Sequence, residues 1–314
     1  MNKKPYAIGL LALLLCLALC LAACAAEQPP AEGTASAGQT PAEGQDAEEP
    51  AAAAPKVILV VSFGTSYNDS RDNTIGAIET AIQDAYPDYQ VRRAFTSQII
   101  IDKLAERDGL VIDNVAQAVE RLIADGVKEL VVQPTHVMNG YEYTDMMAEI
   151  APYEGRFDSV KYGLPLLSAD QDYADLAAAL VAETQDYDGE GTAIVYMGHG
   201  TEADSNSVYT KMQQALIDAG QDNYFIGTVE AKPDLADVLA AVGENGAGKV
   251  VLLPLMIVAG DHANNDMAGD EEDSWKTAFK KEGYEVEPVI KGLGEYSLVR
   301  QMFVEHVAQA VAGN

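Results

Sequence analysis

Short apolar runs rich in Val, Ile and Leu alternate along the chain with segments in which apolar residues recur every three or four positions. The clearest runs predict strands at 56–63, 129–137, 192–198 and 249–258, and weaker runs predict strands at 89–95, 159–165, 223–230 and 284–290. The intervening periodic segments predict helices at 69–85, 114–125, 169–184, 207–219, 233–242, 274–281 and 297–311. Strands that alternate with helices in this way predict an α/β fold built on parallel sheets.

The pattern repeats within the chain. The similar pairs are "LVVSFGTS" (59–66) with "IVYMGHGT" (194–201), "RRAFTS" (92–97) with "IGTVEA" (226–231), and "LVVQPTHVMNGYEYTDMM" (130–147) with "VVLLPLMIVAGDHANNDM" (250–267). Aligning Pro134 with Pro254 places Glu142 on His262. The repeat predicts two similar parallel-sheet domains, flavodoxin- or Rossmann-like, over 56–184 and 185–296, followed by a terminal helical segment over 297–314.

The first 55 residues differ from the rest. "MNKKPYAIGLLALLLCLALCLAAC" has a basic start, a short apolar core and small residues before a cysteine, and it resembles a bacterial lipoprotein signal over 1–24. Cys24 is then expected to carry lipid. A plain transmembrane anchor is the alternative, although a span needs about 20 apolar residues. Residues 25–55 lack aromatic and large aliphatic side chains, which predicts a disordered tether. An exported protein, lipid-anchored at the outer face of the cytoplasmic membrane or in the periplasm, is expected.

Composition excludes several function classes. The net charge of −29 and the pI near 4.2 argue against nucleic acid and broad anionic membrane contact, and are compatible with binding cations. All three cysteines lie at or before residue 24, so the globular part has neither disulfides nor thiol ligands. Walker A and dinucleotide-binding glycine patterns are absent from the sequence, as is "GxSxG". Nucleotide cofactors and a serine hydrolase are therefore disfavoured.

Three groups that can ligate a metal fall at predicted strand ends in the second half. His199 lies in "GHG", Glu230 ends "GTVE", and His262 lies in "AGDH", where Asp261 is expected to orient its ring. Open α/β sheets bind ligands beyond the carboxyl ends of their strands. Two imidazoles and a carboxylate suit a borderline divalent metal such as Co²⁺ or Fe²⁺. The alternatives are a turn histidine, a capped surface loop and a solvated glutamate.

Other polar positions have weaker patterns. The "SFGTS" segment (62–66) could cradle an anion, so Ser62, Gly64 and Thr65 are cleft candidates. His136 is predicted to be a hydrogen-bonded core histidine, with a cleft-lining role as the alternative. His306 is expected to take no chemical part, and the acidic run at 269–275 to be a solvated loop.

Several ordered motifs resemble the anaerobic sirohydrochlorin cobaltochelatases of the class II chelatase superfamily. They are "LVVSFGTS", "RRAFTSQIIIDKLAERDG", "THVMNGYEY", "GLPLLS", "YMGHG", "PLMIVAGDHANNDMAGDEEDSWK" and "GLGEY", and they extend from Lys56 to the last helix. The resemblance implies two α/β domains with a cleft between them and a last helix that packs back on the first domain. It implies a tetrapyrrole substrate, Co²⁺ as substrate metal with Fe²⁺ as the alternative, and no nucleotide.

The resemblance also implies residue roles. His199 would accept pyrrole protons and contact the metal, His262 would be a second metal ligand, and Glu230 would complete the set. Because the substrate bears carboxylates while the chain is acidic, cations are expected to line the cleft, with Arg92, Arg93 and Lys211 as candidates.

The export signal departs from the cytoplasmic setting of cobalamin synthesis. It leaves open a non-enzymatic, extracytoplasmic lipoprotein that binds a tetrapyrrole, haem or metal without turnover. A cation-scavenging surface protein is disfavoured by the ordered motifs. A homo-oligomer is left open.

Overall fold

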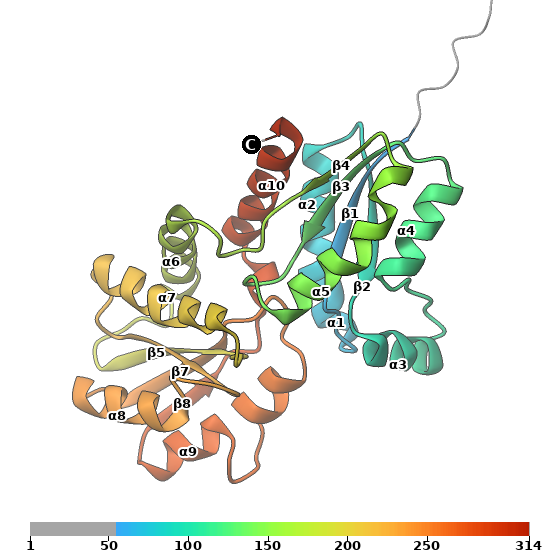
Figure 1. Cartoon of the computed structure of the whole chain (residues 1–314). Coiled ribbons are helices and arrows are strands. Elements are labelled where there is room, and N and C mark those ends of the chain that lie inside the picture. Colours follow the sequence, from blue (N-terminus) through green and yellow to red (C-terminus); the bar gives the residue numbers. More distant parts are fainter. Residues whose placement is uncertain (1–54, 314) are drawn as a thin grey trace, which may run out of the picture. The chain divides into compact units, whose positions relative to one another are not determined.

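The computed structural model describes residues 55–313 (Figure 1). The predicted signal segment, Cys24 and the tether up to residue 54 lie outside the described residues. Within 55–313, no helix combines the length and the apolar character needed to cross a membrane.

Eight strands form two separate four-stranded sheets, and every pairing is parallel. The first sheet has the order β2-β1-β3-β4, with β1 (Lys56–Ser62), β2 (Gln90–Phe95), β3 (Glu129–Pro134) and β4 (Ser159–Tyr162). The second has the order β6-β5-β7-β8, with β5 (Thr192–Gly198), β6 (Tyr224–Thr228), β7 (Lys249–Pro254) and β8 (Glu285–Pro288). The predicted α/β class with two similar parallel sheets is confirmed.

Helices connect the strands. They are α1 (Asn68–Arg71), α2 (Ala77–Ala85), α3 (Gln98–Asp108), α4 (Val115–Ala124), α5 (Tyr141–Ile150), α6 (Asp170–Thr184), α7 (Ser207–Asp218), α8 (Leu235–Asn245), α9 (Trp275–Lys281) and α10 (Ser297–Ala312). A π-helical turn at Asp72–Gly76 joins α1 to α2, and another occupies Ala263–Met267. Short 3-10 segments lie at Ala151–Arg156, Asp204–Asn206 and Leu293–Glu295.

Two central strands end earlier than their apolar runs predict. The runs at 129–137 and 249–258 stop pairing at Pro134 and Pro254. Apolar residues continue past Pro254 because the following loop is itself buried: Leu255 is 1% and Ile257 8% exposed. The buried apolar residues of this loop therefore gave the same sequence pattern as a longer strand.

Strand register tests the internal repeat. Val61 pairs with Pro134 in the first sheet, and Met197 pairs with Pro254 in the second, which confirms the alignment of the two prolines. Ser62 faces Phe95, and Gly198 faces Thr228. In the structure Ser62 is therefore equivalent to Gly198, and Phe95 to Thr228. Aligning the quoted segments of these two pairs without gaps would place each residue one position away from this equivalence. The residue equivalent to His199 is thus Phe63.

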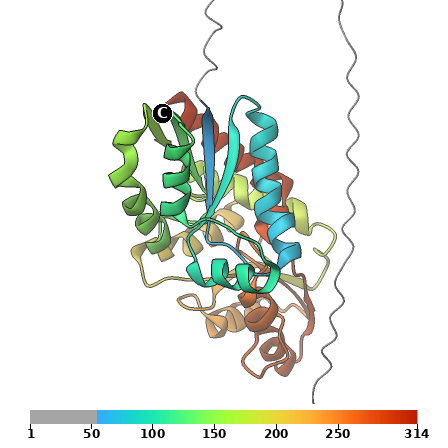
Figure 2. The ribbon, with the colours of Figure 1, turned by 90° about the vertical axis from the view of Figure 1, so that its right-hand side faces the viewer.

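The last helix returns to the first half. After β8 the chain leads into α10, which contacts α2, β3, β4 and α6. Figures 1 and 2 both show this dark red helix beside the strands of the first sheet. Phe303 and Val307 of α10 are fully buried in a core cluster that also holds Ile78 of α2 and Ile194 of β5. One continuous apolar core therefore joins elements of both halves.

Candidate metal centre

His199 and Glu230 are positioned by neighbouring strand ends. His199 follows β5 directly, Glu230 lies two residues beyond β6, and the Glu230 amide donates a hydrogen bond of 2.9 Å to the His199 carbonyl. The glycines that flank His199 make room for protein atoms. A Cβ on Gly198 would lie 2.2 Å from the Tyr209 ring, and one on Gly200, where φ is +88°, would lie 2.8 Å from the Ala231 nitrogen. This turn therefore requires glycine at both positions.

His262 lies at the start of the second π-helical turn. Its Nδ1 is 2.7 Å from Asp266 Oδ2, four residues later on the same face. Asp261, which was expected to orient this ring, instead accepts hydrogen bonds from Asn265 (2.9 Å) and from the Tyr67 hydroxyl (3.5 Å). That expectation was wrong because adjacent residues on a helical turn point in different directions, whereas residues four apart are neighbours.

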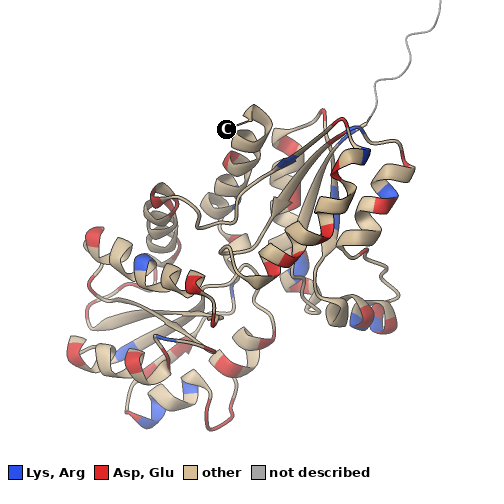
Figure 3. Ribbon diagram, in the orientation of Figure 1, with Lys and Arg blue, Asp and Glu red and all other residues tan. Residues whose placement is uncertain are grey.

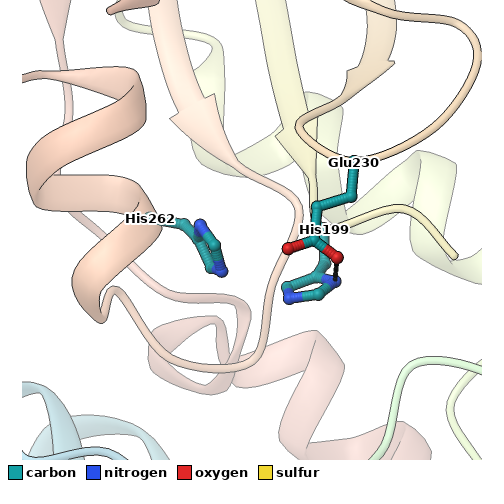
Figure 4. Close-up of side chains that lie close together, drawn as sticks. All are labelled: His199, Glu230 and His262. Carbon is teal, nitrogen blue, oxygen red and sulfur yellow. Dashed lines mark ion pairs between the residues drawn. The ribbon is translucent and has the colours of Figure 1, made fainter.

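The three side chains converge, as Figure 4 shows. One ligand atom from each of His199, Glu230 and His262 lies within 4.8 Å of the other two. The two imidazole rings are nearly perpendicular, with centroids 4.7 Å apart. All three side chains are partly exposed to solvent. Among the residues that the structure describes, no other group of histidines, cysteines and carboxylates has this spacing.

Hydrogen-bond partners decide which imidazole nitrogen is free. His199 Nδ1 lies 2.9 Å from the Gly200 carbonyl, and His262 Nδ1 lies beside the Asp266 carboxylate. Both partners accept, so each Nδ1 carries the proton and each Nε2 keeps its lone pair. Glu230 Oε2 lies 3.6 Å from His199 Nδ1. The centre therefore offers two imidazole Nε2 atoms and a carboxylate, a set suited to Co²⁺, Fe²⁺ or Zn²⁺.

The first half lacks this set at the equivalent positions. The Ser97 amide donates to the Phe63 carbonyl at 3.2 Å, as Glu230 does to His199, so Phe63, Ser97 and Glu142 occupy the places of His199, Glu230 and His262. Phe63 and Ser97 are poor metal ligands. Phe63 is nevertheless 50% exposed, although it directly follows a buried strand. Only the second half of the repeat holds the complete ligand set.

Three of the predicted cleft residues, Ser62, Gly64 and Thr65, are packed against other parts of the chain. Ser62 is 1% exposed, and its Oγ accepts a hydrogen bond of 2.8 Å from Thr135, which directly follows β3. A Cβ on Gly64 would lie 2.6 Å from the Phe95 ring. Thr65 is also buried, and its Oγ1 accepts from the Tyr67 amide, close to Gly260 of the second half. Ser62 and Gly64 therefore pack within the first half, and Thr65 lies where the first half meets Gly260 of the second.

His136 is buried but lacks the expected partners. Neither ring nitrogen has a hydrogen-bond partner among the described residues. Burial lowers the pKa of His136 to about 4, and the nearby charge of Glu142 opposes this only weakly. The prediction of a hydrogen-bonded core histidine was therefore wrong, and the ring is held neutral at physiological pH.

This buried ring should make stability depend on pH. The unfolded chain binds a proton at His136 below about pH 6.5, whereas the native chain does not until about pH 4, so stability is lost as pH falls through this window. Between pH 7.5 and 4.5 the loss from this residue should be roughly 2–3 kcal/mol. Urea unfolding of the protein and of His136→Leu at both pH values should show the larger loss in the unsubstituted chain. Equal losses would contradict the assignment.

The cations expected in the cleft are engaged elsewhere. Arg92 pairs with Asp125, Arg93 makes a two-bond pair with Glu79 (2.7 and 2.6 Å), and Lys211 lies over the Tyr173 ring. The strand pattern did not reveal these contacts, because it does not show which side chains the folded neighbours supply. Asp266 was missed, although its spacing of four residues from His262 could have indicated it.

Comparisons with known proteins agree with this geometry. Residues 56–312 match the family described as cobalt chelatase (CbiK). The chain is 39% identical over 256 residues to the sirohydrochlorin cobaltochelatase of Salmonella typhimurium, covering 82% of this chain and 96% of that protein. It is 31% identical over 259 residues to sirohydrochlorin cobaltochelatase CbiKC of Nitratidesulfovibrio vulgaris, covering 82% and 91%.

Solved structures of chelatase type share the fold. SirB from Bacillus subtilis with Fe³⁺ has a TM-score of 0.59 at 16% identity, covering 82% of this chain and 96% of that one. A multi-domain protein from Deinococcus radiodurans with structural similarity to chelatases has a TM-score of 0.56 at 16% identity, covering 83% and 56%. At these identities the likeness concerns the fold alone.

Proposed function

The chain belongs to the cobalt chelatase (CbiK) family, and on that premise we propose that it inserts Co²⁺ into sirohydrochlorin at the centre formed by His199, Glu230 and His262. The observation that carries the proposal is the convergence of these three side chains, from three separate loops, with both Nε2 lone pairs free. Fe²⁺ is an alternative substrate metal, since the same ligand types bind it.

The reaction requires a metal donor and a proton acceptor in one place. Insertion of M²⁺ replaces two pyrrole N–H protons, so the ion enters and two protons leave. His262 and Glu230 hold the ion beside the ring, while His199 first contacts the ion and then accepts one pyrrole proton at Nε2 once the metal has moved to the ring nitrogens. The second proton passes to solvent water, which reaches the partly exposed centre. Histidine suits this step because its charge changes in the neutral pH range. The partly exposed ligands bind the ion without enclosing it, which allows its transfer.

A direct assay tests the proposal. Sirohydrochlorin mixed with Co²⁺ and the protein should change its absorbance faster than the mixture without protein, and a His199→Ala, His262→Ala double variant should lose the acceleration. Fe²⁺ assayed in parallel would identify the preferred metal. If the pigment binds but conversion never exceeds the uncatalysed rate, the chain is a carrier and not a chelatase.

The N-terminal segment favours the second candidate function, a carrier, and a location outside the cytoplasm. The "LAAC" sequence ending at Cys24 supports lipid anchoring at the outer face of the cytoplasmic membrane or in the periplasm. Such a protein could bind a tetrapyrrole or metal without turnover. Mass spectrometry of the purified N-terminus would reveal a diacylated Cys24, and an unprocessed Met1 would contradict the anchor.

Asp266 should tune the metal affinity. Its carboxylate fixes the His262 tautomer through the 2.7 Å contact with Nδ1, so Asp266→Ala should weaken Co²⁺ binding by about 10–100-fold. Calorimetric titration of Co²⁺ in the absence of pigment would measure this. Asp261→Ala is the matched control, since Asp261 is adjacent to His262 but does not contact its ring. Equal effects of the two variants would show that general negative charge, and not ring orientation, matters.

A further inference from the structure

A second concave site adjoins the loop that carries His262. This cavity, of about 640 Å³, lies between the segment around α1, helix α3 and the loop after β7. Its walls include Asn68, Lys103 and Arg107 from the first half, with Ala259, Asn264 and Glu295 from the second. The three residues of the metal centre do not line it.

Two cations from α3 enter this cavity from the same helix face. Lys103 and Arg107 are four residues apart, so their side chains are neighbours one helical turn apart. Figure 3 shows basic positions on α3 next to acidic positions of the same helix, in a ribbon where acidic positions are numerous. Many cations of the chain are paired with carboxylates, among them Lys56, Arg93 and Arg121. Arg107 is also paired, with Asp108, whereas Lys103 forms no ion pair within residues 55–313.

The hydrogen bonding of the two cations leaves donors for a ligand. Arg107 forms a two-bond ion pair with Asp108 through Nε and Nη2, and its Nη2 also donates to Asn68 at 2.8 Å. Within residues 55–313 its Nη1 makes no hydrogen bond, so this edge of the guanidinium still faces outward as a donor. Lys103 forms no ion pair or side-chain hydrogen bond with any residue in that range. An oriented guanidinium beside an unpaired ammonium is an arrangement suited to a carboxylate.

The cavity and the metal centre share a wall. Ala259 and Asn264 flank His262 on either side in sequence, and Ser70 Oγ accepts a hydrogen bond of 2.9 Å from the Ala259 amide. The Tyr67 hydroxyl reaches Asp261, next to His262, at 3.5 Å. The cavity therefore adjoins the loop that carries His262.

We propose that Lys103 and Arg107 form a carboxylate-binding subsite that holds acidic side chains of the tetrapyrrole while its ring nitrogens face the metal centre. The assignment rests on the proposed function, because it takes the macrocycle as the ligand. The cavity is also lined by Asp69 and Glu295, so its two cations balance these acids in a chain whose net charge is −29.

Charge-removing variants test the subsite in the full-length protein. Lys103→Gln and Arg107→Gln should each raise the Kd for metal-free sirohydrochlorin about 10-fold, and the double variant up to about 100-fold, measured by fluorescence titration. Lys128→Gln is the matched control, since Lys128 is an exposed lysine just before β3, at the opposite ends of the strands. Lys103→Arg should retain affinity. Co²⁺ affinity without pigment should stay unchanged, and thermal unfolding should confirm that each variant is folded.

The outcomes separate the possible ligands and the two hypotheses. Unchanged pigment affinity in the double variant overturns the subsite, whether or not cobalt insertion proceeds. If citrate, as a free polycarboxylate, binds the protein and loses affinity in the variants while the pigment does not, the cavity serves a separate anion and the assignment to the macrocycle fails. If pigment affinity falls as expected but cobalt is never inserted, the subsite stands and the chelatase function fails.

Discussion

Replacing His199 by alanine should slow Co²⁺ insertion into sirohydrochlorin by about 10²–10⁴-fold, the range typical of losing a positioned general base. The residue is the one side chain at the centre whose proposed role includes both metal contact and proton acceptance. Its Nδ1 faces the Gly200 carbonyl at 2.9 Å, which leaves Nε2 as the reactive atom. The initial rate of the absorbance change, at saturating pigment and metal, measures the effect.

Two further readouts distinguish a lost base from a lost structure. The affinity for metal-free pigment should stay within a few-fold of the unsubstituted protein, because the macrocycle is held elsewhere. The midpoint of thermal unfolding should also stay close to that of the unsubstituted protein, which shows that the variant is folded. A His199→Ala protein that retains a third or more of the original rate would exclude the residue as the principal proton acceptor.

Replacing His306 by leucine should lower the free energy of unfolding by about 3–5 kcal/mol, because it leaves a buried carboxylate without its partner. His306 is 3% exposed and lies on α10, with Nε2 at 3.2 Å from Asp172 Oδ1 and Nδ1 at 3.1 Å from the Leu164 carbonyl. Asp172 Oδ2 also accepts from the amides of Ser168 and Ala169 at 2.8 and 2.7 Å. The pair thus connects the last helix to the segment that leads from the first half into α6.

Urea unfolding of single and double variants checks this assignment. The double variant His306→Leu, Asp172→Asn should lose less free energy of unfolding than the sum of the two single variants. Each single substitution already leaves the other side chain without its partner. His306→Leu should leave Co²⁺ affinity unchanged, because its contacts lie in the first half and α6. Strictly additive effects would show that the two side chains are not energetically coupled.

The three candidate metal ligands were predictable from the sequence because they lie at the carboxyl ends of strands. His199, Glu230 and His262 could be found together because parallel strands of one sheet deliver their carboxyl ends to one edge, whatever the details of packing. The same periodic patterns located all eight strands to within a few residues. Helices α3 and α5 were not predicted: in α3 three consecutive isoleucines follow Gln98, and α5 buries only Met146 and Ile150. Neither segment has a strong helical stripe.

The predictions that were wrong or missing concern contacts with residues distant in sequence, or contacts that depend on the local backbone geometry. The pairing of Arg93 with Glu79, 14 residues away, is created by packing α2 against β2 and has no signature in either segment. Asp266 contacts His262 only because a π-helical turn follows the histidine. His136 is a different case, because the folded chain brings no hydrogen-bonding group near its two ring nitrogens, and an absent partner has no pattern in the sequence.

The return of α10 has a consequence for the metal-bearing half. The described chain starts with β1 and finishes with α10, and Lys161 of β4 donates a 2.6 Å hydrogen bond to the carbonyl of Val311 near the end of that helix. The second sheet is thus inserted between β4 and α10 in the chain. The chain leaves the first half before β5 and returns to it after β8. The half that holds His199, Glu230 and His262 is therefore joined to the first half at both of its boundaries, so within residues 55–313 it has no free end.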